Sequence, residues 1–242
     1  MDAHELAGQL RQRESLAAAL FALRTQEQGD WHAPETLLQM PTLESLLQDF
    51  ARGQGHPDGD RRAIASLWSR WHFWAVLPPF MAALALHRHV PQVRALLLGP
   101  DRRTCAVQWW DSPRALRPHT LQTQCESIVH DAAPLIQALA TASRLSPKVL
   151  WGNVGTLLDY MLTQLHTQAD ASQTVLKQFG ALLTEPSLAD ATPNPLYQAV
   201  RPESAGTSVR RRKICCLYYA LPGFDLCGNC PRIKSTIQYV PT

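Results

Sequence analysis

Two nucleotide-binding signatures are missing from this chain: the sequence contains neither a G-x-G-x-x-G run nor a P-loop. It also shows no grouping of serine, histidine and aspartate, and no paired carboxylates, that would indicate nucleophilic or acid–base catalysis. No internal repeat or low-complexity tract is present. The sequence therefore does not indicate a bound flavin or nicotinamide, and it does not indicate hydrolytic chemistry.

Long apolar segments are also scarce. The amino terminus, Met1-Asp2-Ala3-His4-Glu5, lacks the basic start and apolar core of a secretory signal. The most apolar stretch, residues 71–86, is interrupted by a proline pair and is too short for a confident membrane span. We expect a core helix there and a cytoplasmic protein. The sequence leaves open whether the protein contacts the inner face of the cytoplasmic membrane.

Charge is unevenly distributed along the 242 residues. Residues 201–242 contain seven Lys or Arg and two Asp or Glu, a net charge of +5, whereas residues 1–200 have a net charge of −2. The hydrophobic fraction of 45% is ordinary for a globular protein. The basic character therefore belongs to the carboxyl-terminal segment.

Apolar periodicity predicts a mainly α fold of the α+β class, with a small β-hairpin or sheet. We expect a helical body over residues 1–200 and a cluster-binding segment over residues 201–242. The expected helices cover residues 4–27, 42–53, 61–86 with a kink or break at Pro78-Pro79, 119–145 with an interruption at Pro134, 147–165 and 171–184. The expected strands cover residues 93–98 and 104–110.

Two features of the helical body allow more than one interpretation. The tryptophans at 68, 71 and 74 repeat at helical spacing, which favours core packing over a pocket for a bulky ligand. Asn153 interrupts an apolar helical face, where its side chain either satisfies buried polar groups or contacts a ligand. Cys105 and Cys125 are expected to be buried free thiols.

Four of the six cysteines lie within sixteen residues: Cys215, Cys216, Cys227 and Cys230. A C-x-x-C turn lets two sulfurs converge on one metal atom. Adjacent cysteines in an extended segment point to opposite faces, so they suit a binuclear cluster better than a single tetrahedral ion. Zinc prefers two C-x₂₋₄-C knuckles or mixed cysteine and histidine ligands, and no histidine follows His166. Spacing favours a [2Fe–2S] cluster and leaves zinc, a redox disulfide or inert thiols open.

The same run resembles a known family. C-C, ten residues and C-x-x-C, preceded by Arg211-Arg212, is similar to the carboxyl-terminal signature of the FhuF-type ferric siderophore reductases. Three upstream segments also resemble this family, and the likeness covers about residues 60–232. These segments are residues 66–71 with 77–81, residues 150–155 and residues 194–197.

The resemblance implies an oxidoreductase that acts on metal ions. The substrate would be a ferric siderophore, with hydroxamates the best-known class, and the [2Fe–2S] ligands would be Cys215, Cys216, Cys227 and Cys230. Because no nucleotide motif is present, we expect electrons from an external donor such as a ferredoxin, a flavodoxin or a reductase.

Candidate residues for substrate or partner contact, taken from the residues themselves, are Arg211, Arg212, Tyr218 and Tyr219. Cations beside a cluster favour its reduced, more negative state and attract an acidic donor. The same residues are equally compatible with a basic strand edge that resists aggregation. The rival interpretation is a zinc-stapled interaction or nucleic-acid module. The short basic run disfavours it, and we expect no nucleic-acid partner.

Overall fold

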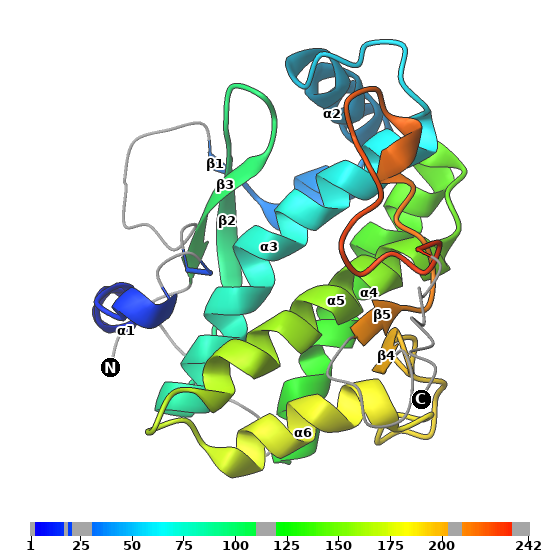
Figure 1. The fold of residues 1–242 in the computed structure, drawn as a ribbon. Coiled ribbons are helices and arrows are strands. Elements are labelled where there is room, and N and C mark those ends of the chain that lie inside the picture. The colour runs from blue at the N-terminus through cyan, green and yellow to red at the C-terminus, as the bar shows by residue number, and fades with distance from the viewer. Residues whose placement is uncertain (1–2, 17–18, 21–30, 110–119, 203–209, 234–242) are drawn as a thin grey trace, which may run out of the picture.

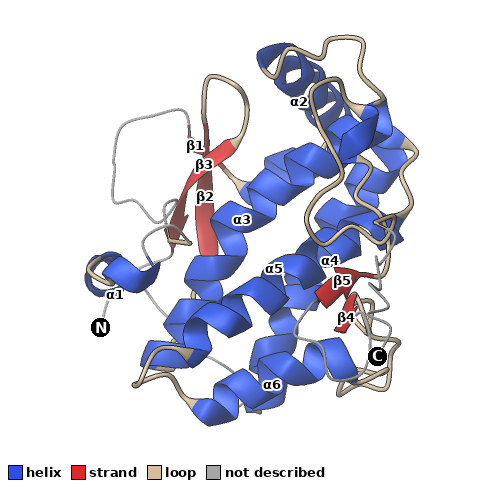
Figure 2. Cartoon of the chain, viewed as in Figure 1, coloured by secondary structure: helices blue, strands red, loops and turns tan. Residues whose placement is uncertain are grey.

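A computed structural model describes residues 3–16, 19–20, 31–109, 120–202 and 210–233. Its fold is mainly α-helical with two small antiparallel sheets, as predicted (Figure 2). The α-helices are α1 (Ala3–Arg11), α2 (Met40–Gly53), α3 (Arg61–His87), α4 (Leu121–Ser143), α5 (Pro147–His166) and α6 (Gln173–Thr184). The strands are β1 (Trp31–His32), β2 (Val93–Leu98), β3 (Thr104–Trp109), β4 (Val200–Pro202) and β5 (Arg210–Arg212). Short 3₁₀ helices occupy Glu14–Leu16, Pro34–Leu38 and Tyr218–Ala220.

Helices α3 and α5 lie side by side through the middle of the molecule, with α6 beside α5 (Figure 1). Both central helices bury apolar side chains along most of their length, including Trp68 and Met81 on α3 and Leu158 on α5. The carboxyl-terminal segment lies against the amino-terminal half of α3 and against α5 (Figure 1). The two central helices therefore support the segment that carries the four clustered cysteines.

Helix α3 runs through Pro78 and Pro79 without interruption. The predicted break at this proline pair is therefore wrong. A proline inside a helix costs about 3 kcal/mol because it removes an amide donor and crowds the preceding turn. Both prolines are buried, as are most of their neighbours on the helix. Tertiary packing of that apolar stretch outweighs the local penalty, and α4 likewise continues through Pro134.

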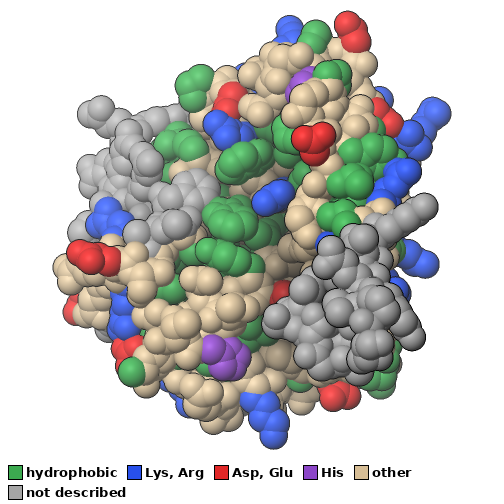
Figure 3. Space-filling model, in the orientation of Figure 1, with side chains coloured by type: hydrophobic (Ala, Val, Ile, Leu, Met, Phe, Trp, Pro, Cys, Tyr) green, Lys and Arg blue, Asp and Glu red, His purple; other side chains and the backbone are tan. Residues whose placement is uncertain are grey.

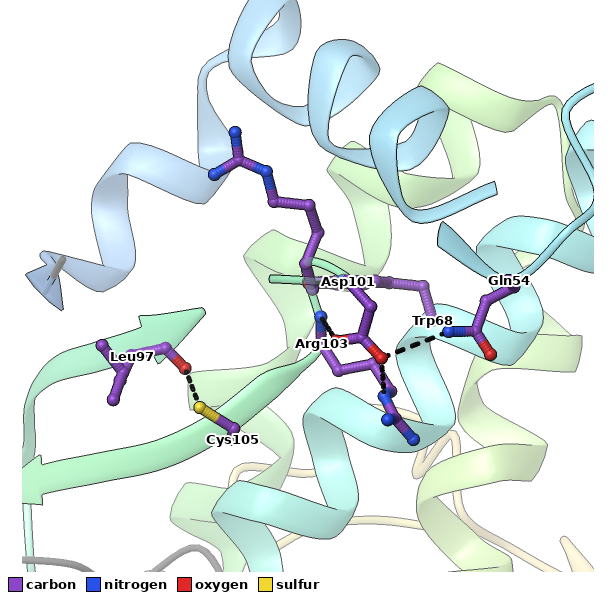
Figure 4. Close-up of polar contacts among 7 residues, drawn as sticks. Gln54, Trp68, Leu97, Asp101, Arg103 and Cys105 are labelled. Atoms are coloured by element: carbon purple, nitrogen blue, oxygen red, sulfur yellow. Dashed lines mark hydrogen bonds and ion pairs between the residues drawn. The ribbon is translucent and has the colours of Figure 1, made fainter. Parts of the chain in front are cut away.

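The β2–β3 hairpin is confirmed, and β1 extends it to the three-stranded antiparallel order β1-β2-β3. Its turn is fastened to the helices by polar contacts around Asp101 (Figure 4). The Asp101 carboxylate accepts hydrogen bonds from the backbone N–H of Arg103 at 3.2 Å and from Nε2 of Gln54 at 3.3 Å. Nε1 of Trp68 donates to the carbonyl of Arg102 at 3.0 Å. The Trp68 bond joins the turn to α3, and the Gln54 bond joins it to the end of α2.

Several predicted boundaries shift in the structure. Helix α2 begins at Met40 and not after Thr42, because Pro41 supplies the preset backbone angle that favours a first turn. The described part of the predicted helix over residues 4–27 forms α1 and the 3₁₀ helix Glu14–Leu16. Residues 17–18 and 21–27 of that prediction, and Trp110, lie outside the described residues. Among the helices described here, none is both long enough and apolar enough to cross a membrane.

Candidate functional site

The four clustered cysteines follow directly after a short hairpin. Strands β4 and β5 pair in antiparallel register, with Val200 opposite Arg212. The backbone N–H of Lys213 then donates to the carbonyl of Ala199 at 2.9 Å, and that of Arg212 donates to Asn229 at 2.9 Å. The hairpin therefore joins the end of the helical body to both ends of the loop that carries the four cysteines, residues 215–230, called the cysteine loop below.

The sulfurs of this loop meet in two pairs. Sγ of Cys216 lies 3.7 Å from Sγ of Cys227, and Sγ of Cys215 lies 4.0 Å from Sγ of Cys230. Two thiolates on one tetrahedral metal, with metal–sulfur bonds of about 2.3 Å, lie about 3.8 Å apart. Each pair therefore has the spacing that one iron of a [2Fe–2S] cluster requires.

A single zinc ion takes four donors around one point. Two separate sulfur pairs match a binuclear cluster, in which each iron takes two protein ligands.

Backbone amides donate to these sulfurs. The N–H of Leu217 lies 3.5 Å from Sγ of Cys215, and the N–H of Arg232 lies 3.5 Å from Sγ of Cys230. Leu217 has a left-handed backbone with a φ of 66°, which turns the chain sharply after the adjacent cysteines. Hydrogen bonds of this kind stabilise negative charge on sulfur and so support thiolate ligands.

The paired thiols Cys216 and Cys227 have opposite proton affinities. The hydrogen bond from Cys227, together with the backbone N–H of Tyr218 and the charge of Arg212, lowers the pKa of Cys216 to about 6 despite its burial. The pKa of Cys227 is raised because it donates that hydrogen bond and is itself partly buried. Burial is also the main cause of the raised pKa of Cys215. The site therefore favours the thiolate form of Cys216, and a cationic cofactor would favour that form at Cys215 and Cys227 as well.

Arg212 is buried beside this loop, with 3% of its surface exposed. Its Nη2 donates to Oδ1 of Asn153 on α5 at 2.6 Å, and its Nε donates to the carbonyl of Ile214 at 3.3 Å. Gly152 eases the close approach, because a Cβ atom there would lie 3.2 Å from Nη2 of Arg212, a tight contact. Arg212 thereby connects the cysteine loop to the helical body.

Asn153 is itself 1% exposed and joins α5 to α3. Its Nδ2 donates to the carbonyl of Ser66 at 2.9 Å and to Oγ of Ser69 at 2.8 Å. Of the two interpretations open for Asn153, the structure supports the satisfaction of buried polar groups. Its amide accepts from Arg212 on one side and donates to α3 on the other.

Tyr218 and Tyr219, adjacent in sequence, lie in different environments. Tyr218 is buried, its hydroxyl donates to the carbonyl of Ser66 at 3.4 Å, and burial raises its pKa. The guanidinium carbon of Arg70 lies 5.6 Å from the centre of its ring. Tyr219 is 38% exposed and carries Arg232 over its ring at 4.3 Å. Tyr218 thus packs the loop onto α3, whereas Tyr219 faces solvent.

Arg211 lies at the rim of the site. Its Nη1 donates to the carbonyl of Gly228 at 2.9 Å, between Cys227 and Cys230. The exposed hydrophobic side chains Phe224 and Leu226 belong to the same loop. Of the predicted candidates, Tyr219 is exposed and Arg211 partly exposed, whereas Arg212 and Tyr218 are buried.

The sequence interpretation missed the contact between Arg212 and Asn153, which are 59 residues apart. Two features of the sequence could have indicated this contact. Asn153 is a polar residue on an otherwise apolar helical face, and Gly152 beside it lacks the side chain that would exclude a neighbour. The three tryptophans of α3 differ in burial. Trp68 is fully buried, whereas Trp71 and Trp74 are partly buried.

Comparisons with known proteins agree with this site. A family model described as "FhuF 2Fe-2S C-terminal domain" matches residues 212–232, and one described as "Ferric iron reductase FhuF-like transporter" matches residues 98–207. The chain is 29% identical over 213 residues to the "Ferric siderophore reductase" of Escherichia coli (strain K12), a match that covers 84% of this chain and 77% of that relative. The cofactor of the matched carboxyl-terminal domain is a [2Fe–2S] cluster.

Proposed function

We propose that this chain, which belongs to the FhuF-type ferric siderophore reductase family, reduces the Fe³⁺ of a ferric siderophore to Fe²⁺ and so releases the iron. The cluster ligands in this proposal are Cys215, Cys216, Cys227 and Cys230. The observation that carries it is the pairing of their sulfurs at 3.7 Å and 4.0 Å, within one loop. That spacing fits two irons.

The chemistry requires little beyond a one-electron carrier. When bound, the cluster supplies one electron, which converts one ferric ion of the substrate to one ferrous ion. Ferrous iron binds hard oxygen ligands more weakly, so the siderophore then loses its hold on the metal. The protein's own residues hold the cluster near the surface: Cys215 and Cys227 are only partly buried, while Cys216 and Cys230 are enclosed. The electron therefore has a short path to a docked substrate.

A strip of partly exposed side chains on α3 is our proposed docking surface for the substrate. Trp74 packs against Tyr160 of α5 with ring centres 5.2 Å apart, and Arg103 lies over the ring of Trp71 at 4.5 Å. Arg70, one turn before Trp74, reaches Tyr218 in the cysteine loop. Hydrophobic side chains gather over the middle of this face, with Lys or Arg beside them (Figure 3). Broad aromatic surfaces suit a bulky, weakly charged chelate, and hydroxamate complexes are of that class.

The electron donor is proposed to be an external protein with an acidic docking face, such as a ferredoxin, a flavodoxin or a reductase. Residues 201–242 carry a net charge of +5, which favours encounter with an acidic partner. We place the reaction in the cytoplasm, at or near the inner face of the membrane through which imported chelates arrive. The division into a helical body over residues 1–200 and a cluster segment over residues 201–242 stays a prediction.

The test is to purify the protein anaerobically and to follow its visible absorption. Dithionite should bleach a red-brown protein, and a ferric hydroxamate siderophore should restore the colour while Fe²⁺ forms in equal amount. Trp74→Ala should raise the KM for the siderophore without changing the absorption spectrum, and Thr163→Ala, an exposed change on α5, serves as its control. A colourless protein that holds one zinc ion would refute the proposed function.

A further inference from the structure

A cleft lies on the side of α3 that faces the β2–β3 hairpin. Its volume is about 480 Å³, and its walls come from the 3₁₀ helix Pro34–Leu38, α3, the hairpin and α4. The described residues that line it include none of the cysteine loop, which lies on a different side of α3 from the hairpin (Figure 1). Protein interiors contain few voids larger than a water molecule, so a space of this size is typical of a ligand-binding site.

The inner wall of this cleft is apolar and aromatic. Phe73 of α3 and Leu96 of β2 line it and are each 2% exposed, and Trp109 of β3 lines it at 7% exposed. Leu135 of α4 closes the same wall from the opposite side of the hairpin. Flat rings and branched side chains of this kind bind an apolar or aromatic body through contact area.

One buried side chain of the wall is polar. Nδ1 of His72 lies 3.0 Å from Oγ1 of Thr104, and the imidazole stacks on the ring of Trp68 with centres 5.1 Å apart. Burial lowers the pKa of His72 to about 3, so the imidazole is uncharged at neutral pH. The inner wall therefore carries no positive charge.

The mouth of the cleft is polar and acidic. Glu35 from the 3₁₀ helix and Asp131 from α4 line it and are exposed, as are Gln92 and His130. Among the described lining residues, none is a lysine or an arginine. Two carboxylates without a basic neighbour in the lining attract a positive group and repel a negative one.

We propose that this cleft binds a small organic cation, a molecule with an apolar or aromatic body and an ammonium-type end. The body lies against Phe73 and Trp109, and the cation lies at the mouth between Glu35 and Asp131. The same carboxylates disfavour fatty acids and other anions. The proposal goes beyond the reductase activity and does not depend on the cluster, because no residue of the cysteine loop takes part.

Three probes with one body and different ends test the ligand class. Isothermal titration calorimetry of the full chain at pH 8 compares phenylbutylammonium, phenylbutanol and phenylbutyrate. The cation should bind at least about tenfold more tightly than the anion, with the alcohol between them, because each exposed carboxylate contributes a modest attraction or repulsion. Equal affinities would overturn the cationic class, and no binding of any probe would overturn the site.

Substitutions test the location of the site. Asp131→Asn should weaken binding of the cation about fivefold and leave the alcohol unchanged, whereas Glu185→Gln, an exposed carboxylate outside the lining, should change neither. Equal affinities of the cation for these two variants would refute the role of Asp131. Val76→Phe, at a partly buried lining position, should abolish binding of both probes because it fills the cleft.

A measurement on the wild-type protein covers the case in which Val76→Phe does not fold. Nuclear Overhauser contacts should join the phenyl protons of the bound ammonium probe to the indole of Trp109, and their absence would overturn the placement. Neither this contact nor the heat of binding requires siderophore reduction. A protein that lacks reductase activity and still binds the cation would therefore refute the proposed function alone.

Discussion

Replacement of Asn153 by alanine should destabilise the protein more than its single amide suggests. The side chain is buried, donates to Ser66 and Ser69 on α3, and accepts from Nη2 of Arg212 at 2.6 Å. After the substitution, the oxygen of Ser66 keeps the Ser69 hydroxyl as a donor, at 2.7 Å. The guanidinium of Arg212, however, loses its hydrogen bond to α5.

The size of the loss in stability follows from the buried guanidinium N–H that is left without a hydrogen-bond acceptor. An unsatisfied buried polar group costs about 1–3 kcal/mol, and a charged one costs more. Loss of the amide also leaves a small void in a packed interface. A total of about 2–4 kcal/mol is expected, which for a chain of this length corresponds to a fall of about 4–16 °C in the apparent Tm.

Thermal unfolding followed by circular dichroism under anaerobic conditions measures this effect. Thr156→Ala serves as the control, because the Thr156 hydroxyl donates only to the carbonyl of Gly152 within the same helix. Asn153→Asp keeps an acceptor for Arg212 but removes the Nδ2 donor to Ser66 and Ser69, so the apparent Tm should still fall through loss of the bonds to α3. A change of less than about 2 °C for Asn153→Ala would contradict the view that this amide links the cluster loop to both helices.

Three further predictions concern the supporting structure. Gly155→Ala places a methyl group 2.4 Å from Cβ of Ala199, so it should destabilise the protein by about 1–3 kcal/mol and lower the apparent Tm. Gly180→Ala, with open space around it, should raise the apparent Tm. Burial lowers the pKa of His72 to about 3, so the free energy of unfolding decreases as pH falls below the unfolded-state pKa of 6.5. His72→Gln should remove about 2 kcal/mol of the decrease between pH 7 and pH 5. The measurement compares the fall in Tm between these two pH values for the variant and the wild type. Burial raises the pKa of Cys125 to about 12, so iodoacetamide at pH 8 should leave Cys125 unmodified in native protein and label it in urea, as mass spectrometry of peptides can show.

Much of the fold follows from the sequence because local patterns carry it. Apolar spacing locates α5 and α6 closely, and the turn residues at Gly99 to Asp101 locate the β2–β3 hairpin. The error at Pro78 has a physical cause. Sequence patterns register the local penalty of proline, whereas the burial that offsets it depends on which helices pack there.

Part of the site can likewise be predicted from the local sequence, and part depends on contacts between distant residues. Spacing alone brings the four cysteines together, because they occupy one short loop. It does not determine which sulfurs pair, since that depends on how residues 217–226 fold. The left-handed turn at Leu217 and the 3₁₀ helix at Tyr218–Ala220 redirect the chain so that Cys216 meets Cys227.

Two glycines on α5 show that the helical body does more than carry the cluster loop. Gly152 admits the guanidinium of Arg212, and Gly155, one turn later, admits Ala199 at the base of the β4–β5 hairpin. A larger side chain at Gly155 would clash with Ala199 and push the hairpin away from α5, and one at Gly152 would crowd the guanidinium. Since Arg212 begins the matched [2Fe–2S] domain and Asn153 belongs to the body, the position of the buried charge beside the sulfurs depends on both. The position of Arg212 at the cysteine loop is therefore a property of its packing against α5 and not of the cysteine motif alone.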